Sequence, residues 1–113
     1  MTDPTTAMEY DMAREIIPRD HLACGTWPDG ALTKDAPPGA RLGQLIAQAL
    51  TAAMADQDIG QRELARRAGL THPTVLRALD GQSLPSTHTL LLLEIALGTP
   101  LWPTTLYRNG PQH

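Results

Sequence analysis

The stretch QRELARRAGLTHPTVLRALDG, residues 61–81, decides the fold. Its first half has apolar residues at helical spacing, so a first helix carries one narrow apolar stripe of Leu64, Ala65 and Ala68. Gly69 follows where the chain must turn sharply, because glycine lacks a Cβ and adopts positive φ easily. A second stripe at helical spacing is made of Val75, Ala78 and Leu79. The stretch therefore predicts two short helices joined by a tight turn.

Local signals mark both ends of the second helix. Thr71 offers a side-chain oxygen to the unpaired amides of the first turn, and Pro73 occupies that turn, where a missing N–H costs little. Asp80 and Gly81 then close the helix with a C-terminal glycine.

These residues resemble the lambda-repressor-like (Cro-type) helix-turn-helix DNA-binding family. The matching positions are Gln61, Leu64, Ala65, Gly69, Thr71, Thr74-Val75, Arg77 and Gly81. The resemblance covers about half the chain, from Arg41 to Gly98. It departs from the family pattern at Met54, where relatives often carry arginine, and at Gly60, where they more often carry threonine or serine. The implied fold is all-α: a compact four- to five-helix domain with an N-terminal extension and a short C-terminal tail.

Two further helices complete the predicted domain. Apolar residues repeat at i, i+3, i+4 and i+7 from Arg41 to about Asp56, which indicates an amphipathic helix. Ser86 caps another helix from about Thr87 to Leu97, and Gly98 ends it. We therefore expect an extension and linker in residues 1–40, the helix-turn-helix DNA-binding domain in 41–98 and a tail in 99–113.

The N-terminal segment is acidic. Residues 1–40 hold seven acidic and three basic side chains, a net charge of −4, whereas residues 41–113 hold five acidic and six basic ones, a net charge of +1. Residues 7–17 fit a helix, although alternating polar and apolar residues there also fit a strand. The run from Cys24 to Ala40 is predicted to be a loop or linker, with Trp27 anchoring it to the globular part.

Composition argues against several classes of protein. A chain of 113 residues suits one small domain, and it shows no phosphate-binding glycine loop, Cys-x-x-Cys pair or His-Glu-x-x-His run. We therefore expect no enzyme, no cofactor and no metal site. The single Cys24 cannot form an internal disulfide, and no stretch is apolar enough for a membrane span, which favours the cytoplasm.

The family resemblance implies that the second helix lies in the major groove of double-stranded DNA. The predicted DNA-binding residues are Gln61, Arg62, Arg66, Thr71, His72, Pro73, Thr74, Leu76 and Arg77. Arg77 suits guanine because its guanidinium donates two parallel hydrogen bonds, although a phosphate contact fits it as well. Arg62 and Arg66 share one exposed face and suit either phosphates or solvent.

The expected function is sequence-specific DNA binding by a transcriptional regulator, a repressor that reads a palindromic operator with residues 72–79 as a homodimer. The predicted dimer interface uses Leu91, Leu92, Ile95, Leu101, Trp102 and Leu106, because these apolar residues exceed what one core-facing stripe needs. A tail that folds back over the same helix within one monomer is the competing interpretation. The alternative function is an antitoxin or adaptor that binds a partner protein through residues 1–40.

Overall fold

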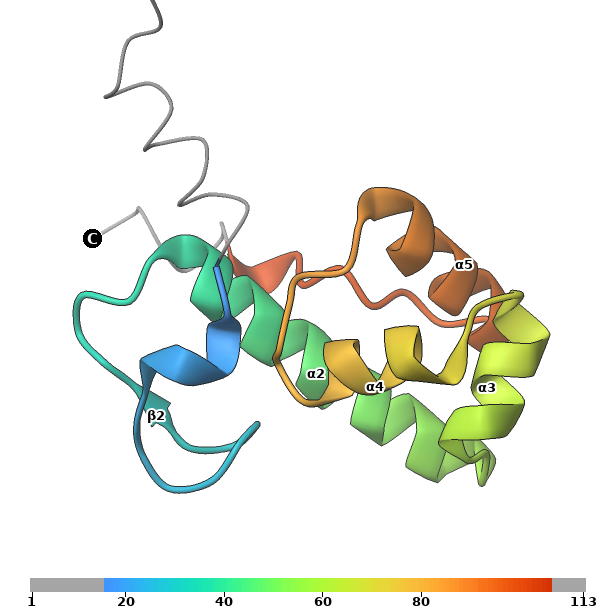
Figure 1. The fold of residues 1–113 in the computed structure, drawn as a ribbon, viewed down its shortest axis with the longest axis horizontal. Helices are drawn as coiled ribbons and strands as arrows, with labels where there is room; N and C mark the ends of the chain where they lie inside the picture. The colour runs from blue at the N-terminus through green and yellow to red at the C-terminus, as the bar shows by residue number, and fades with distance from the viewer. Residues whose placement is uncertain (1–15, 107–113) are drawn as a thin grey trace, which may run out of the picture.

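The computed structural model describes residues 16–106, which form a helical fold with one small sheet (Figure 1). A 3₁₀ helix, η1 (Pro18–His21), leads into two short strands, β1 (Leu22–Cys24) and β2 (Ala31–Leu32). Four α-helices follow: α2 (Pro38–Gln57), α3 (Gln61–Ala68), α4 (His72–Leu79) and α5 (Thr87–Leu97). The predicted helix or strand in residues 7–17 lies outside the described residues, apart from its last two positions.

The turn between α3 and α4 has the predicted geometry. Gly69 adopts a φ of 71°, and its N–H bonds back to the last turn of α3. A Cβ at Gly69 would meet nothing within 4 Å, so the backbone angle alone favours glycine there. Thr71 caps α4, its hydroxyl accepting the N–H of Thr74 at 3.3 Å. The predicted helix-turn-helix is thus confirmed in its local details.

The bounds of α5 agree with the prediction, and those of α2 differ by a turn. Ser86 caps α5 by accepting the N–H of Thr89, and Gly98 ends the helix with a φ of 62°. The helix α2 begins at Pro38 instead of Arg41, because proline in the first turn has its φ preset and needs no amide partner. At its other end, Asp58 takes a left-handed conformation with φ 53°.

A single core lies between the four α-helices. In Figure 1 the helix α4 crosses in front of α2, and α3 lies beside both α4 and α5. The core consists of Ile46, Leu50, Ala53, Met54, Ile59, Leu64, Ala65, Ala68, Val75, Ala78, Leu90, Leu93, Leu97 and Leu101. Apart from Ile59 and Leu101, these residues come from the four helices that the sequence pattern predicts.

The expected linker is a docked hairpin, which corrects the sequence-based prediction. The strands β1 and β2 pair antiparallel, with Leu22 opposite Leu32. Side-chain amides of α2 hold the loop between the strands: Gln44 Nε2 donates to the carbonyl of Gly30 at 2.6 Å, and Gln48 Nε2 donates to that of Pro28 at 2.9 Å. These hydrogen bonds have no periodic signature in the sequence. Trp27 contacts the end of α4, as its predicted role of anchor requires.

The beginning of the C-terminal tail folds back onto α5. Glu94 Oε2 accepts the backbone N–H of Leu101 at 2.7 Å and that of Trp102 at 3.1 Å. Leu101 is consequently only 1% exposed and belongs to the monomer core, so its assignment to a dimer interface was wrong. Leu91 and Ile95 remain 51% and 67% exposed, because the described part of the tail does not cover them.

Core packing predicts a large difference between two leucines of α2. Leu50 is fully buried, whereas Leu42 is only partly buried against the core. Leu50→Ala should lower the free energy of unfolding by about 2–5 kcal/mol, the usual cost of removing a buried leucine side chain. Leu42→Ala, the matched control, should cost clearly less. Equal losses in urea denaturation would show that the core is not centred where α2 meets the other helices.

Candidate nucleic-acid interface

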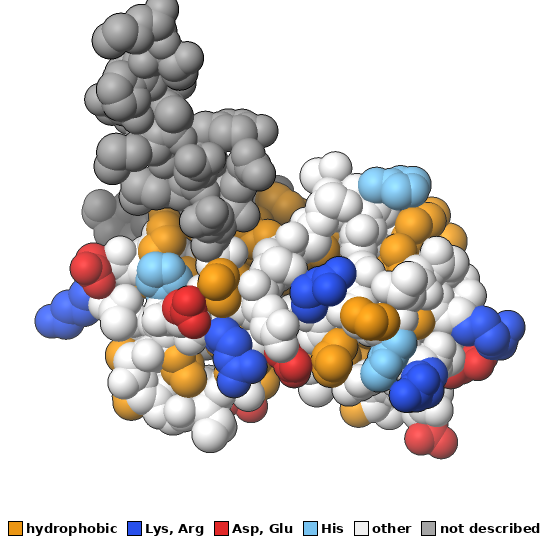
Figure 2. All heavy atoms as spheres, viewed as in Figure 1, with side chains coloured by type: hydrophobic (Ala, Val, Ile, Leu, Met, Phe, Trp, Pro, Cys, Tyr) orange, Lys and Arg blue, Asp and Glu red, His pale blue; other side chains and the backbone are white. Residues whose placement is uncertain are grey.

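The helix α4 buries one side and presents the other. Val75 and Ala78 point into the core, which leaves Arg77 exposed and Thr74 and Leu76 half-buried. Figure 2 shows arginine side chains spread over the surface of α3 and α4, with hydrophobic and histidine side chains between them. This mixture of cationic, hydroxyl and apolar groups can contact both a phosphate backbone and base edges.

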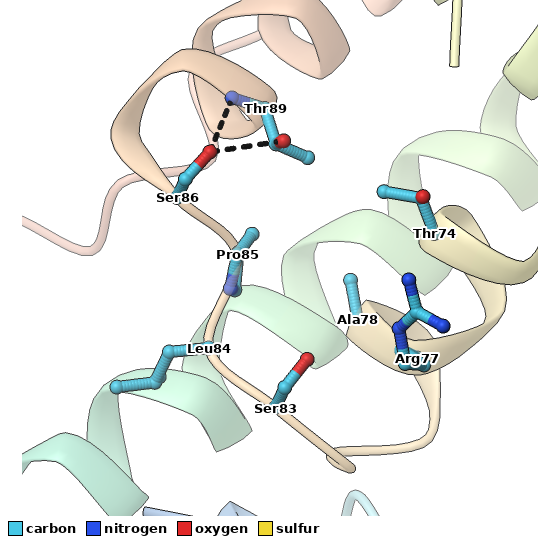
Figure 3. A pocket seen from close by; sticks show the side chains of 8 residues that line it. All are labelled: Thr74, Arg77, Ala78, Ser83, Leu84, Pro85, Ser86 and Thr89. Atoms are coloured by element: carbon cyan, nitrogen blue, oxygen red, sulfur yellow. Dashed lines mark hydrogen bonds between the residues drawn. The ribbon is translucent and has the colours of Figure 1, made fainter. Parts of the chain in front are cut away.

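A hollow of about 280 Å³ opens between α4 and the start of α5. Thr74 and Arg77 line one side of it and the hydroxyls of Ser86 and Thr89 line the other, with Ser83 from the connecting loop between them (Figure 3). Ser86 and Thr89 are hydrogen-bonded to each other at 3.0 Å, which fixes the first turn of α5. The hollow therefore combines one guanidinium with several hydroxyl groups.

The first residues of α3 and α4 are joined directly. His72 Nε2 lies 3.0 Å from Gln61 Oε1. Because an amide oxygen only accepts, the imidazole donates in this hydrogen bond. Gln61 thus supports the start of α4, and its amide nitrogen still has N–H groups to donate. A second, open hollow of about 590 Å³ contains Gln61, Arg62 and His72.

Glu63 binds two of the arginines on α3. Arg66 donates to both carboxylate oxygens, at 3.0 and 2.5 Å, and Arg67 Nε donates at 2.8 Å. Hydrogen bonds from Arg66 and then Arg67 lower the pKa of Glu63 from 4.5 to about 2, and the carboxylate raises the pKa of Arg66. All three side chains are solvent-accessible, so salt screens their attraction. Arg66 is therefore engaged in an ion pair and not simply solvated.

The nine predicted DNA-binding residues all lie on α3, α4 or the Thr71 cap between them. The polar groups Ser83, Ser86 and Thr89 of the hollow were missed as site residues. Their signal was present in the sequence, since Ser86 was predicted as a helix cap, but a cap alone does not indicate which surface it faces. Met54, at the position where relatives often carry arginine, is buried in the core.

The geometry defines a helix-turn-helix unit: two short helices linked by a glycine turn, the second exposing Arg77. Comparison with protein families agrees, because residues 50–101 match a helix-turn-helix family model. These residues form a helix-turn-helix domain of the lambda-repressor, Cro type, and at the level of this family it is a DNA-binding regulator domain. The chain has no significant match among curated proteins or among solved structures.

Two features are absent from residues 16–106. None of their helices combines the length and the apolar character needed to cross a membrane. Within the same range, no three histidine, cysteine, aspartate or glutamate side chains come together in a way that could hold a metal ion.

The ion pairs predict an unusual titration for Glu63. Its carboxyl should titrate near pH 2 in a ¹³C NMR experiment, and replacing Arg66 and Arg67 with glutamine should return the pKa toward 4.5. Since the folded-state pKa is depressed, the pairing contributes to stability above pH 4.5, and this contribution is lost as pH falls through about 2. A wild-type pKa near 4.5 at low salt would show that the ion pairs do not persist in solution.

Proposed function

We propose that the protein is a sequence-specific transcriptional regulator that binds double-stranded DNA as a homodimer and reads the major groove with α4. The observation that carries the proposal is the exposed face of α4, where Arg77 and Thr74 stand beside the hydroxyl-lined hollow at the start of α5. This face belongs to the helix that a family of DNA-binding regulators uses for recognition.

Arg77 is the proposed base-reading residue. Its guanidinium can donate two parallel hydrogen bonds to O6 and N7 of guanine. Thr74, one turn earlier on the same face, can contact a thymine methyl group or a phosphate. Leu76 and Pro73 offer apolar surface for the same methyl group, and Thr71 lies at the helix start, where a phosphate would pass.

The phosphate contacts are proposed on both sides of α4. Gln61 keeps its amide nitrogen for a phosphate oxygen while its carbonyl oxygen holds His72. Arg62 is exposed beside it and adds a positive charge. Arg66 reaches a phosphate only by exchanging Glu63 for it, so its contribution is reduced.

Dimerisation follows from the exposed side of α5. Leu91, Ile95 and Trp102 are 51%, 67% and 42% exposed, and burying each aliphatic side chain contributes about 1.5–3 kcal/mol. Leu92 is half-buried beside Leu91 and packs against the core, and Leu106 is half-buried in the tail. A two-fold dimer places two copies of α4 roughly 34 Å apart, one turn of DNA, and so fits a palindromic operator.

Repression is the simplest regulatory outcome, because a bound dimer excludes other proteins from the same stretch of DNA. The second candidate is an antitoxin or adaptor, which the net charge of −4 in residues 1–40 favours. Purification distinguishes the two functions. An antitoxin should co-purify with a stoichiometric partner protein, whereas an autonomous regulator should bind its DNA site without another protein.

Selection from a random duplex library tests the proposed function, and Arg77→Ala tests the reading residue. The substitution should reduce the free energy of binding to the selected site by about 1–3 kcal/mol and relax the preference at one base pair. Arg66→Ala serves as the comparison: it should weaken binding to all sequences slightly and flatten the dependence of affinity on salt. An equal loss on every sequence for Arg77→Ala would reassign Arg77 to a phosphate.

The dimer is tested by Leu91→Glu combined with Ile95→Glu. Both side chains are exposed, so the monomer should keep its melting temperature, while light scattering should show half the mass and operator affinity should fall. Thr87→Glu together with His88→Glu adds two charges to the exposed first turn of the same helix. It serves as the control for the mass alone, because Ser86 and Thr89 on either side line the proposed DNA-binding hollow. A wild-type protein that stays monomeric at high concentration, with and without the selected DNA, would contradict the dimer.

A further inference from the structure

We infer that residues 18–32 brace the C-terminal end of α4, and that Trp27 is the positioning residue through which this brace sets the aim of Arg77. The inference rests on the proposed function, since Arg77 matters as a reader of DNA. It assigns a role in recognition to a segment that precedes the family-matched residues 50–101.

The first contact satisfies the end of α4. The last four carbonyls of a helix have no amide partner within the helix. Trp27 Nε1 donates to one of them, the carbonyl of Leu79, at 2.9 Å. Leu79 lies two residues after Arg77, so this hydrogen bond acts in the same turn as the proposed reading residue.

The second contact is steric. A Cβ built on Gly81 would lie 2.3 Å from Cζ2 of the Trp27 ring, which shows that the indole packs directly on the Gly81 backbone. Gly81 also has a φ of 68°, and its carbonyl accepts the N–H of Arg19 at 3.0 Å. Both ends of the segment from η1 to Trp27 therefore touch the residues that end α4.

The far side of the brace is attached to α2. Gln44 is 1% exposed, donates to the carbonyl of Gly30 and accepts from Arg41 at 2.6 Å. One turn along, Gln48 donates to the carbonyl of Pro28, the residue after Trp27. The indole thus links the end of α4 to the longest helix of the fold.

Such a link matters because α4 has only eight residues. Helices this short owe their order to tertiary contacts and not to their own hydrogen bonds. Bidentate contact with a base requires side-chain placement to within about 0.5 Å. Val75 and Ala78 seat the middle of α4, and Trp27 holds the turn from which Arg77 projects.

The brace changes what a deletion of residues 1–40 should do. Charge alone predicts that removing a segment of net charge −4 leaves DNA affinity intact or raises it. The same deletion removes Trp27 and its hydrogen bond to α4, which opposes that gain. Point substitutions at the brace are therefore the informative variants.

The test compares full-length wild type with Trp27→Phe, which keeps an aromatic ring and loses the N–H donor. Affinity is measured for the duplex selected from a random library and for a scrambled duplex of equal length. In Trp27→Phe the ratio of the affinity for the selected duplex to that for the scrambled one should fall about fivefold, the factor in an equilibrium constant that one hydrogen bond represents. Amide hydrogen exchange should quicken at Asp80 and Gln82, whose N–H groups bond to α4, and should stay unchanged in α2.

Two further variants complete the design. Ala52→Gly weakens α2 at an exposed alanine whose side chain makes none of the hydrogen bonds of the brace, and it should reduce stability without changing the affinity ratio. Gln48→Ala removes one of the two α2 hydrogen bonds of the brace and leaves the indole intact. It should reproduce the effect of Trp27→Phe in smaller measure, and it keeps the inference testable if Trp27→Phe fails to fold.

The inference is overturned if Trp27→Phe and Gln48→Ala retain the wild-type affinity ratio and exchange pattern, or if affinity falls equally on both duplexes. A wild-type protein that selects no DNA sequence would instead overturn the proposed function. In that case hydrogen exchange at Asp80 and Gln82 still decides whether Trp27 holds the end of α4.

Discussion

The close approach of α3 and α4 is the constraint on which the rest of the structure depends. It requires small side chains where the two helices meet, and Ala65, Ala68 and Ala78 are all buried there together with Val75. A larger residue at any of these positions would push α4 outward, because packed interiors hold little spare volume. The helix is then held at three levels: His72 against Gln61 at its start, the small residues in its middle and Trp27 at its end.

The part of the fold that follows local rules could be predicted from the sequence. Gly69, Ser86 and Gly98 act through their own backbone or cap geometry, so their positions alone define where α3 ends and where α5 begins and ends. The candidate site was predictable for the same reason. Its residues are neighbours in one short stretch, and helical periodicity separates exposed Arg77 from buried Val75 and Ala78.

The remainder depends on contacts between distant residues, which periodicity does not encode. Trp27 and Leu79 are 52 positions apart, and the hairpin that brings them together has strands of only three and two residues. The position of Leu101 was also not predictable from the sequence pattern. It is apolar and lies between two prolines, so it suits an interface or a core equally well. Glu94, seven positions earlier, accepts the N–H of Leu101 and so holds this residue in the core.

The pairing of Glu63 with Arg66 and Arg67 has a consequence for kinetics. A regulator must find one site among a very large number of unspecific ones, and its time on each is set by phosphate contacts that any sequence supplies. A carboxylate that competes with phosphate for two guanidinium groups shortens the residence time at each unspecific site. Arg77 has no such competitor among the described residues, so in the proposed function its charge stays available to DNA. In the proposed function, the ion pair thus shortens unspecific binding to DNA.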